Sequence, residues 1–301
     1  VLSGPATITG GTNLSFSTSG QVSIVASQAG NSYWNAAPDV TNTFNVTKVG
    51  ASSVTLSDLI HTFDGRAHGA TASTVPVSLT VDLTYNGSAT IPTTAGSYNV
   101  TGTINHLVYS GQATGTLTIA AFVPAGSGTA LDPYRITRVE HLAWMGDTVA
   151  SSSGKYYTVQ NDIDASDTTN WYGGAGFAPI GTDSGAGMPF TGIFNGNGNV
   201  ISQLYIDRPS LDYVGLFGEV GIGGVVRALG LEGGSVIGGS YVGSLAGQIG
   251  SGLGGGTVSN CYATGTVTGS YVVGNLAGMN FGGTVIRCYA TGPATVHGDF
   301  V

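Results

Sequence analysis

Two cysteines stand at the same place in two nearly identical stretches of this sequence. Cys261 lies in GGTVSNCYATG, residues 255–265, and Cys288 lies in GGTVIRCYATG, residues 282–292. They could form a disulfide, or they could pack as two free thiols, because reduced cysteine behaves as a small apolar side chain. A metal site needs more ligands than two thiols, and no histidine accompanies them. The repetition points to architecture rather than to an active site.

Three aspartates in the stretch NDIDASD are candidates for a calcium site: Asp162, Asp164 and Asp167. Ca²⁺ takes roughly six to eight oxygen ligands, and the spacing of these residues does not match a known calcium loop. Aspartates also cap and turn surface loops through hydrogen bonds to the backbone, and we favour this interpretation. Calcium is kept as the alternative, and we expect no other metal or cofactor.

Groups that could carry catalysis are sparse. The five histidines are scattered, and no His-Glu-x-x-His metalloprotease motif occurs. A polysaccharide-degrading enzyme would need clustered carboxylates, or an acid beside a base, along one face. The histidines are His61, His68, His106, His141 and His297, and the charged residues of the repeats described below are Glu219, Glu232, Arg227, Arg287 and Asp299. We therefore predict no catalytic residue.

The composition describes a folded chain with a weakly charged surface. Of 301 residues, 51 are glycine, 41% are hydrophobic and only 8% are charged, with a net charge of −8. Eight basic residues without a cluster argue against nucleic acid and against anionic lipid as partners. No apolar run is long enough to span a bilayer. We expect both ends to be cut, because the sequence opens on strand-like residues and stops within a repeat.

Residues 1–120 have the alternation of half-buried strands. The run VSLTVDLTY, residues 77–85, alternates strictly between apolar and polar side chains, and Asn86-Gly87 then supplies a tight hairpin turn. We predict a partial Ig-like domain over 1–49, lacking its start, and an antiparallel sandwich over 50–120. Pro and Gly mark a linker over 121–133.

The sandwich resembles an MBG domain, a bacterial Ig-like module of large secreted proteins. The residues that carry the resemblance are Phe63-Asp64-Gly65, Tyr85-Asn86-Gly87, Ala95-Gly96-Ser97-Tyr98 and Gly115-Thr116-Leu117-Thr118-Ile119. Residues 19–48 resemble the end of another Ig-like repeat. The resemblance implies a spacer or binding module, and it brings no catalytic residues.

A repeat begins after the only segment with helical periodicity. That segment, residues 137–150, carries Val139, Leu142, Met145 and Val149 at helical spacing, and Thr137 is its expected cap. Three repeat units then open at Tyr213, Tyr241 and Tyr271, at intervals of 28 and 30 residues. A repeat of this length that is rich in glycine and poor in leucine predicts a parallel β-helix with one coil per unit.

Residues from about 131 to 301 resemble the Glug repeats of bacterial surface proteins, named for a Gly-Leu-x-Gly signature, and we place the β-helix domain at 134–301, with its C-terminal end missing. Gly215-Leu216-Phe217-Gly218 fits the signature best, whereas Ser244 and Asn275 depart from it. The stretches PYRITRVEHLAWM, YYTVQNDIDAS, FAPIGT and FTGIFNGNGNVISQLYI occur in the order found at the start of such domains. The resemblance implies a right-handed β-helix, capped here by the short helix.

The alternation within the repeats predicts which side chains face the interior. We expect Cys261 and Cys288 to stack one coil above the other, beneath Ala228, as two reduced and buried thiols, because parallel stacking suits the twist of a disulfide poorly. Their predicted inward neighbours are Val226, Ser259, Ala263, Ile286 and Ala290.

The fold class is therefore all-β: Ig-like sandwiches, then a right-handed parallel β-helix with one capping helix. The expected function is non-catalytic adhesion or scaffolding at the surface of a bacterial cell or outside it. The expected partners are a glycan or another surface protein, contacted in part by the tyrosines at the coil openings, and neighbouring modules of the same chain. The alternatives are a polysaccharide-degrading enzyme and a passive stalk that displays a distant domain.

Overall fold

The structure is a computed structural model, and it describes residues 1, 3–48, 50, 52–148, 152–181, 188–252 and 254–297. It is all-β apart from one α-helix and one 3-10 helix in the described ranges. The chain divides into two compact units. The first holds Val1–His61, Gly69–Pro92 and Ser97–Thr118, and the second holds Thr62–His68, Thr93–Gly96 and Ile119–Val301.

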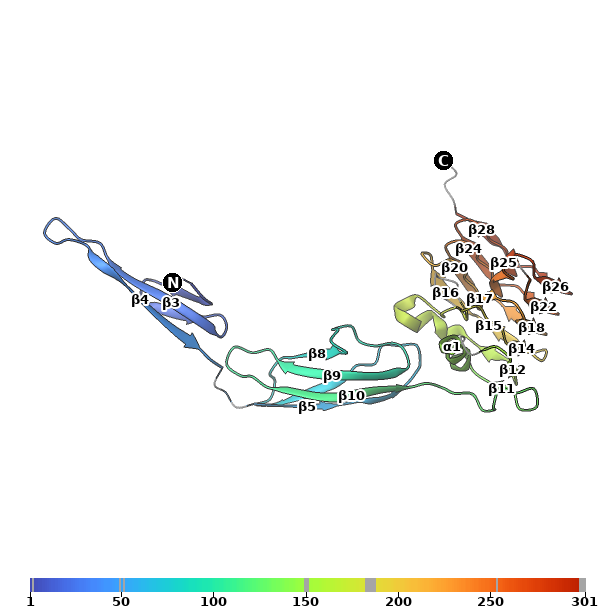
Figure 1. Ribbon diagram of the computed structural model, residues 1–301, viewed down its shortest axis with the longest axis horizontal. Helices are drawn as coiled ribbons and strands as arrows, with labels where there is room; N and C mark the ends of the chain where they lie inside the picture. Colours follow the sequence, from blue (N-terminus) through green and yellow to red (C-terminus); the bar gives the residue numbers. More distant parts are fainter. Residues whose placement is uncertain are drawn as a thin grey trace. The chain divides into compact units, whose positions relative to one another are not determined.

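The first unit is built from antiparallel pairs of strands (Figure 1). β1 pairs with β2, β3 with β4, and β5 with β7, while β6, β10, β9 and β8 form a four-stranded sheet in that order. The strands are β1 (Ala6–Thr9), β2 (Asn13–Phe16), β3 (Gly20–Gln28), β4 (Ala37–Val46), β5 (Ser53–Ser57), β6 (Ile60–Thr62), β7 (Thr71–Val75), β8 (Val81–Tyr85), β9 (Gly96–Ile104) and β10 (Gln112–Ala120). These sheets agree with the predicted Ig-like sandwich.

The run over residues 77–85 is only half a strand. β8 begins at Val81, and Val77 is exposed. Pro76 has no N–H to give to a ladder, and Ser78 has a φ of +69°, which an extended strand cannot contain. The hydroxyl of Thr74 holds this turn by donating to the carbonyl of Pro76 at 2.7 Å and accepting from the N–H of Leu79 at 3.2 Å. The alternation therefore predicted the strand correctly only after the turn.

The Asn86-Gly87 turn forms as predicted. Both residues have positive φ, +49° and +85°, and the N–H of Ser88 donates to the carbonyl of Tyr85 at 3.0 Å. This is the turn that matches the twist of an antiparallel pair, and it leads the chain from β8 towards β9.

The second unit is a parallel β-solenoid, whose strands lie side by side in the stack seen in Figure 1. Four sheets form its faces, with the strand orders β11-β12-β14-β18-β22-β26, β13-β15-β19-β23-β27, β16-β20-β24-β28 and β17-β21-β25. We name each sheet by its first and last strands. Val214, Val242 and Val273 are joined by parallel bridges, so the repeat units that open at the tyrosines stack in parallel as predicted.

The strands of the solenoid are short, because each coil turns a corner after a few residues. They are β11 (Tyr134–Ile136), β12 (Tyr156–Val159), β13 (Ile163–Asp164), β14 (Ile193–Asn195), β15 (Val200–Ser202), β16 (Tyr205–Arg208), β17 (Phe217–Val220), β18 (Val225–Arg227), β19 (Gly230–Glu232), β20 (Ser235–Gly238), β21 (Ala246–Ile249), β22 (Thr257–Ser259), β23 (Tyr262–Ala263), β24 (Thr266–Gly269), β25 (Ala277–Asn280), β26 (Thr284–Ile286), β27 (Tyr289–Ala290) and β28 (Ala294–Val296). Residues 121–133, which precede β11, contain bends and no strand.

The helix α1 (Val139–Asp147) lies beside β11, the first strand of the stack (Figure 1). It buries Val139, Leu142 and Met145 as the spacing predicts, and the ring of Trp144 packs on Tyr134 at 5.0 Å. The expected cap is wrong: Arg138 is the N-cap, and the Thr137 hydroxyl instead lies 3.4 Å from Nδ1 of His141. Val149 lies outside the described residues.

A 3-10 segment, η2 (Ser166–Gly174), packs against residues 62–68 within the second unit. Trp171 is fully buried, with its ring edge-to-face against Phe63 at 5.4 Å. The N–H of Tyr172 donates to the carbonyl of Gly65 at 2.7 Å, and Arg66 bonds Asp167 at 2.6 Å. The segment Phe63-Asp64-Gly65 thus has a packing role in the second unit.

Candidate functional site: an aromatic face of the solenoid

The outer face of the β13–β27 sheet carries a stack of two tyrosines. The register pairs Gly230 with Tyr262 and Tyr262 with Tyr289 on successive coils. Parallel strands in register place equivalent side chains one above the other. The two rings are parallel to within 3°, with centroids 5.1 Å apart, and the ring of Tyr262 covers the bare backbone of Gly230. Tyr289 is 57% exposed, so the stack reaches solvent.

On β19 and β23 the residue that follows Gly230 or Tyr262 faces inward. Leu231 on β19 and Ala263 on β23 are buried and pair with each other across the coils. One residue farther along β19, Glu232 returns to the outer face. The strand alternation therefore places an aromatic ring and a carboxylate side by side on the surface while the interior stays apolar.

Glu232 fixes the phenol of Tyr262. The Tyr262 hydroxyl donates to Oε1 of Glu232 at 2.6 Å, a short charge-assisted bond between neighbouring coils. This hydrogen bond raises the pKa of Tyr262 to about 12, and burial and the charge of Glu232 act in the same direction. The arrangement presents a neutral, oriented aromatic ring beside an acceptor. It can contact a ligand through a ring face and hydrogen bonds, and nothing in it activates a nucleophile.

A second tyrosine stack lies at the coil openings, and it has two members where the sequence indicated three. The rings of Tyr213 and Tyr241 are 4.7 Å apart and inclined by 7°. Tyr271 is displaced, because the bridge from Val242 runs to Val273 and leaves Val272, not Tyr271, level with Tyr241. The extra valine in Tyr271-Val272-Val273-Gly274 causes this shift, and Tyr271 is 66% exposed.

The cysteines stack in the solenoid as predicted, and both are free. Cys261 is buried, and its backbone N–H lies 3.4 Å from the sulfur of Cys288. Burial raises the pKa of the Cys261 thiol to about 12. Cys288 is half-buried, not buried, because it belongs to the last described coil, where β26, β27 and β28 are exposed.

The predicted set of inward neighbours is only partly right. Val226 and Ala263 are buried, but Ser259 is half-buried and Ile286 is 47% exposed. Val258, which was not predicted, is buried instead of Ser259. Asn260 has a φ of +52°, as do its counterparts on the adjacent coils, Ala228 and Arg287. This left-handed residue turns a corner between β22 and β23 and shifts the alternation by one. Cys261 therefore lies level with Leu229 and not beneath Ala228. Ala228 itself is half-buried, and Ala290 on β27 is exposed.

The three calcium candidates have separate hydrogen-bonding roles. Asp162 accepts the N–H of Val200 at 2.8 Å, and Asp164 accepts the N–H of Ser166 at 2.8 Å, a bond that lowers the pKa of Asp164. Asp167 accepts from Arg66, which lowers the pKa of that carboxyl. Across the part of the chain that the structure describes, no three His, Cys, Asp or Glu side chains are grouped to hold a metal ion.

The charged residues considered for catalysis are not gathered on one face. Glu219 is buried on β17, in the β17–β25 sheet, whereas Glu232 lies on the β13–β27 sheet and bonds Tyr262. Arg227, the last residue of β18, and Arg287, which follows β26, are exposed. Asp299 lies outside the described residues. The histidine rings have local partners where hydrogen bonds are seen: His61 with Asp58, His68 with Asp64, His106 with Val108 and His141 with Thr137.

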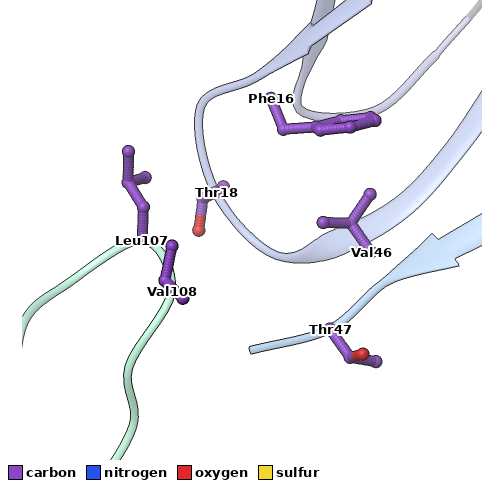
Figure 2. A pocket seen from close by; sticks show the side chains of 6 residues that line it. All are labelled: Phe16, Thr18, Val46, Thr47, Leu107 and Val108. Carbon is purple, nitrogen blue, oxygen red and sulfur yellow. The ribbon is translucent and has the colours of Figure 1, made fainter. Parts of the chain in front are cut away.

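The first unit has an apolar hollow of about 250 Å³, lined by Phe16, Thr18, Val46, Thr47, Leu107 and Val108. Figure 2 shows Leu107 and Val108 across this hollow from Phe16 and Val46. Its lining has no charged group to orient a substrate. The hollow is therefore a weaker candidate than the tyrosine face of the solenoid.

Residues 52–122 match the model of the MBG domain. This agrees with the sandwich of the first unit and with the resemblance seen in the sequence. The match covers the Ig-like segment and leaves the solenoid outside it.

Two curated relatives share sequence with this chain. Halomucin of Haloquadratum walsbyi is 42% identical over 141 residues, which are 46% of this chain and 2% of halomucin. A Gly-rich membrane protein of Evansella cellulosilytica is 39% identical over 110 residues, which are 36% of this chain and 12% of that protein. The chain thus spans a small fraction of the length of each.

Among solved structures, an immunoglobulin A1 protease-like protein of Bacteroides ovatus is similar over 56% of this chain and 50% of its own, with 24% identity and a TM-score of 0.44. A likeness of this degree says nothing about activity. Within the described residues, no helix has the length and apolar character that crossing a membrane requires.

Proposed function

We propose that this chain is a non-catalytic module of an extracellular or cell-surface protein, which adheres to a glycan or to another surface protein. The observation that carries the proposal is the exposed Tyr262–Tyr289 stack beside Glu232 on the β13–β27 sheet. A pair of stacked rings beside a hydrogen-bonding group suits a weak contact with an extended ligand, whose affinity grows with the number of such contacts.

The comparisons support the surface location. An MBG segment together with a β-solenoid fits a surface module, and one relative is named halomucin and another a Gly-rich membrane protein. The low charge fits the same role, because hydroxyl groups, amides and aromatic rings can bind a glycan without a charged cleft. A catalytic site would need preorganised charge, whereas Glu219 and Glu232 lie on different faces.

A binding assay with matched variants tests the proposal. In affinity electrophoresis, soluble neutral and acidic polysaccharides are included in native gels. The loss of electrophoretic mobility that each polysaccharide causes is compared between the parent chain and Tyr289→Ala. We expect at least one polysaccharide to retard the chain and Tyr289→Ala to weaken the effect about tenfold, since an exposed ring is lost at a contact. Leu131→Ala, which truncates an exposed side chain before the solenoid, is the control and should bind as the parent does. Equal retardation of all three proteins would contradict the role of this face.

A further inference from the structure

The tip of the β3–β4 hairpin in the first unit displays two adjacent aromatic side chains. Tyr33 is 87% exposed and Trp34 is 74% exposed. The chain's other two tryptophans differ: Trp171 is fully buried, and Trp144 packs on Tyr134. A tryptophan and a tyrosine left in solvent on a strand connection contribute nothing to a core, so their position calls for a contact outside the unit.

Hydrogen bonds within the tip hold the two residues in place. The side-chain oxygen of Asn31 accepts the N–H groups of Tyr33 at 2.9 Å and Trp34 at 3.0 Å. The backbone N–H of Asn31 donates to the carbonyl of Trp34 at 2.8 Å and closes the turn. Gly30 is required beside it, because a Cβ there would lie 2.3 Å from the Trp34 oxygen. The backbone that carries both rings is therefore ordered before any ligand arrives, which lowers the entropy lost on binding.

The tip is also free of charge. The first 38 residues contain no Asp, Glu, Lys or Arg, and Asp39 is the first charged side chain. The residues that flank the rings, Ser32 and Asn35, are exposed and offer a hydroxyl and an amide. This chemistry does not attract an anionic or a cationic partner. It matches a ligand with apolar C–H faces rimmed by neutral hydroxyl groups.

We propose that the turn of residues 30–35 is a binding site for neutral polysaccharide. Trp34 and Tyr33 stack on the C–H faces of sugar rings, while Ser32 and Asn35 hydrogen-bond the ring hydroxyls. A neutral lipid interface also accepts tryptophan and tyrosine, but the polar residues on both sides of the rings favour a sugar. The inference rests on the proposed adhesive function and adds to it a second contact and a ligand class.

Trp34 supplies its own signal for the test. Iodide quenches the emission of an exposed indole and leaves a buried one such as Trp171 unaffected. The whole chain is titrated with hydroxyethyl cellulose and with galactomannan, and iodide quenching is measured with and without each polysaccharide. We expect at least one of the two to protect Trp34 from iodide. Trp34→Ala and Tyr33→Ala should each weaken binding of that polysaccharide about tenfold, and Trp34→Phe should retain most of the binding. Leu131→Ala, which truncates an exposed apolar side chain elsewhere, should leave it unchanged.

The outcomes separate this inference from the proposed function. Binding of polysaccharide with unchanged quenching of Trp34, and loss of that binding in Tyr289→Ala, would overturn the tip site and leave adhesion by the solenoid intact. Protection of Trp34 with unchanged binding by Tyr289→Ala would support the tip site and contradict the role of the solenoid face. Protection by phosphatidylcholine vesicles, and by neither polysaccharide, would overturn the tip site in favour of a lipid contact. Unchanged emission of Trp171 in each variant confirms that the fold is retained.

Discussion

The backbone N–H of Cys261 points at the sulfur of Cys288 on the next coil, at 3.4 Å, and the two thiols remain free. Equivalent side chains on parallel strands are displaced along the sheet by about 4.8 Å and run parallel, whereas a relaxed disulfide needs a twist of about 90°. The repeat thus uses its cysteines as packing residues.

We expect two thiols per chain when the protein is denatured without a reductant and titrated with a thiol reagent. In the native protein at pH 8, Cys288 should react first and Cys261 much more slowly, because Cys261 is 1% exposed and its pKa is about 12. Cys288→Ser should remove the fast phase and leave the slow one. A titre of zero would show that the bridge exists.

Burial of Cys261 also makes stability depend on pH. Its folded pKa of about 12 lies above the ordinary value of 9.0, so folding favours the protonated thiol. The contribution is complete below pH 9 and is lost as the pH rises towards 12. When the pH is raised from 8 to 11, the free energy of unfolding of the parent should fall by on the order of 2 kcal/mol more than that of Cys261→Ala. Urea unfolding at each pH measures both values. Parallel curves for the two proteins would argue that Cys261 is open to solvent.

The bond between Tyr262 and Glu232 predicts a late-ionising tyrosine. Ultraviolet titration should show two tyrosines that ionise near pH 12: Tyr157, whose pKa is raised by burial, and Tyr262, whose pKa is raised by its hydrogen bond to Glu232. Glu232→Gln should return the pKa of Tyr262 towards the ordinary tyrosine value of 10.0, because a neutral amide does not repel the phenolate. Tyr262→Phe should remove one of the two late groups and leave that of Tyr157, which identifies the Tyr262 signal. If Glu232→Gln leaves the titration unchanged, the two side chains are not bonded in solution.

Two glycine substitutions should have opposite effects on the second unit. Gly65 has a φ of +75°, and a Cβ there would fall on the ring of Trp171. Gly65→Ala should therefore lower the free energy of unfolding of the unit by about 2 kcal/mol or more. Urea unfolding monitored by the fluorescence of Trp171 measures this change. Gly146→Ala in α1 meets no neighbouring atom and should stabilise by about 0.5–1 kcal/mol. A neutral Gly65→Ala would show that residues 62–68 do not pack on η2 as described.

Calcium should have little effect on stability. Asp162, Asp164 and Asp167 each accept a hydrogen bond from a different partner, so they do not converge on one ion. The melting temperature in 5 mM calcium and in excess chelator should agree within error. A melting temperature that rises with calcium in the parent and not in Asp164→Asn would contradict this prediction and support a calcium site at these aspartates.

The sequence predicted the architecture well because repetition and alternation report directly on stacking. Parallel coils, the buried Cys261 and the Asn86-Gly87 turn all followed from periods and from local preferences. The predictions were wrong in detail where a single residue changes the backbone. The left-handed conformation of Asn260 changes which side chains face inward, so that Ser259 does not. The additional valine after Tyr271 moves this tyrosine out of the stack. Such shifts depend on register between coils, which a single period does not specify.

The candidate site was less visible. Tyr262 and Tyr289 follow the repeated cysteines directly, and their identical position was the available signal, but only the register shows that the rings face outward and that Glu232 meets one of them. Tyr33 and Trp34 had a signal too, since they lie in a stretch without charge. Their exposure became clear only when the hairpin showed that no described element covers them.

The proposed adhesive function requires that the chain bind its ligand without cleaving it, and for a polysaccharide one measurement tests this directly. The whole chain is incubated with a panel of neutral and acidic polysaccharides, with and without calcium, and both the bound fraction and the chain length of the polysaccharide are followed. We predict that at least one polysaccharide is bound and that none is shortened. Depolymerisation that Glu219→Gln, Glu232→Gln or Asp299→Asn abolishes would contradict the account and identify an enzyme.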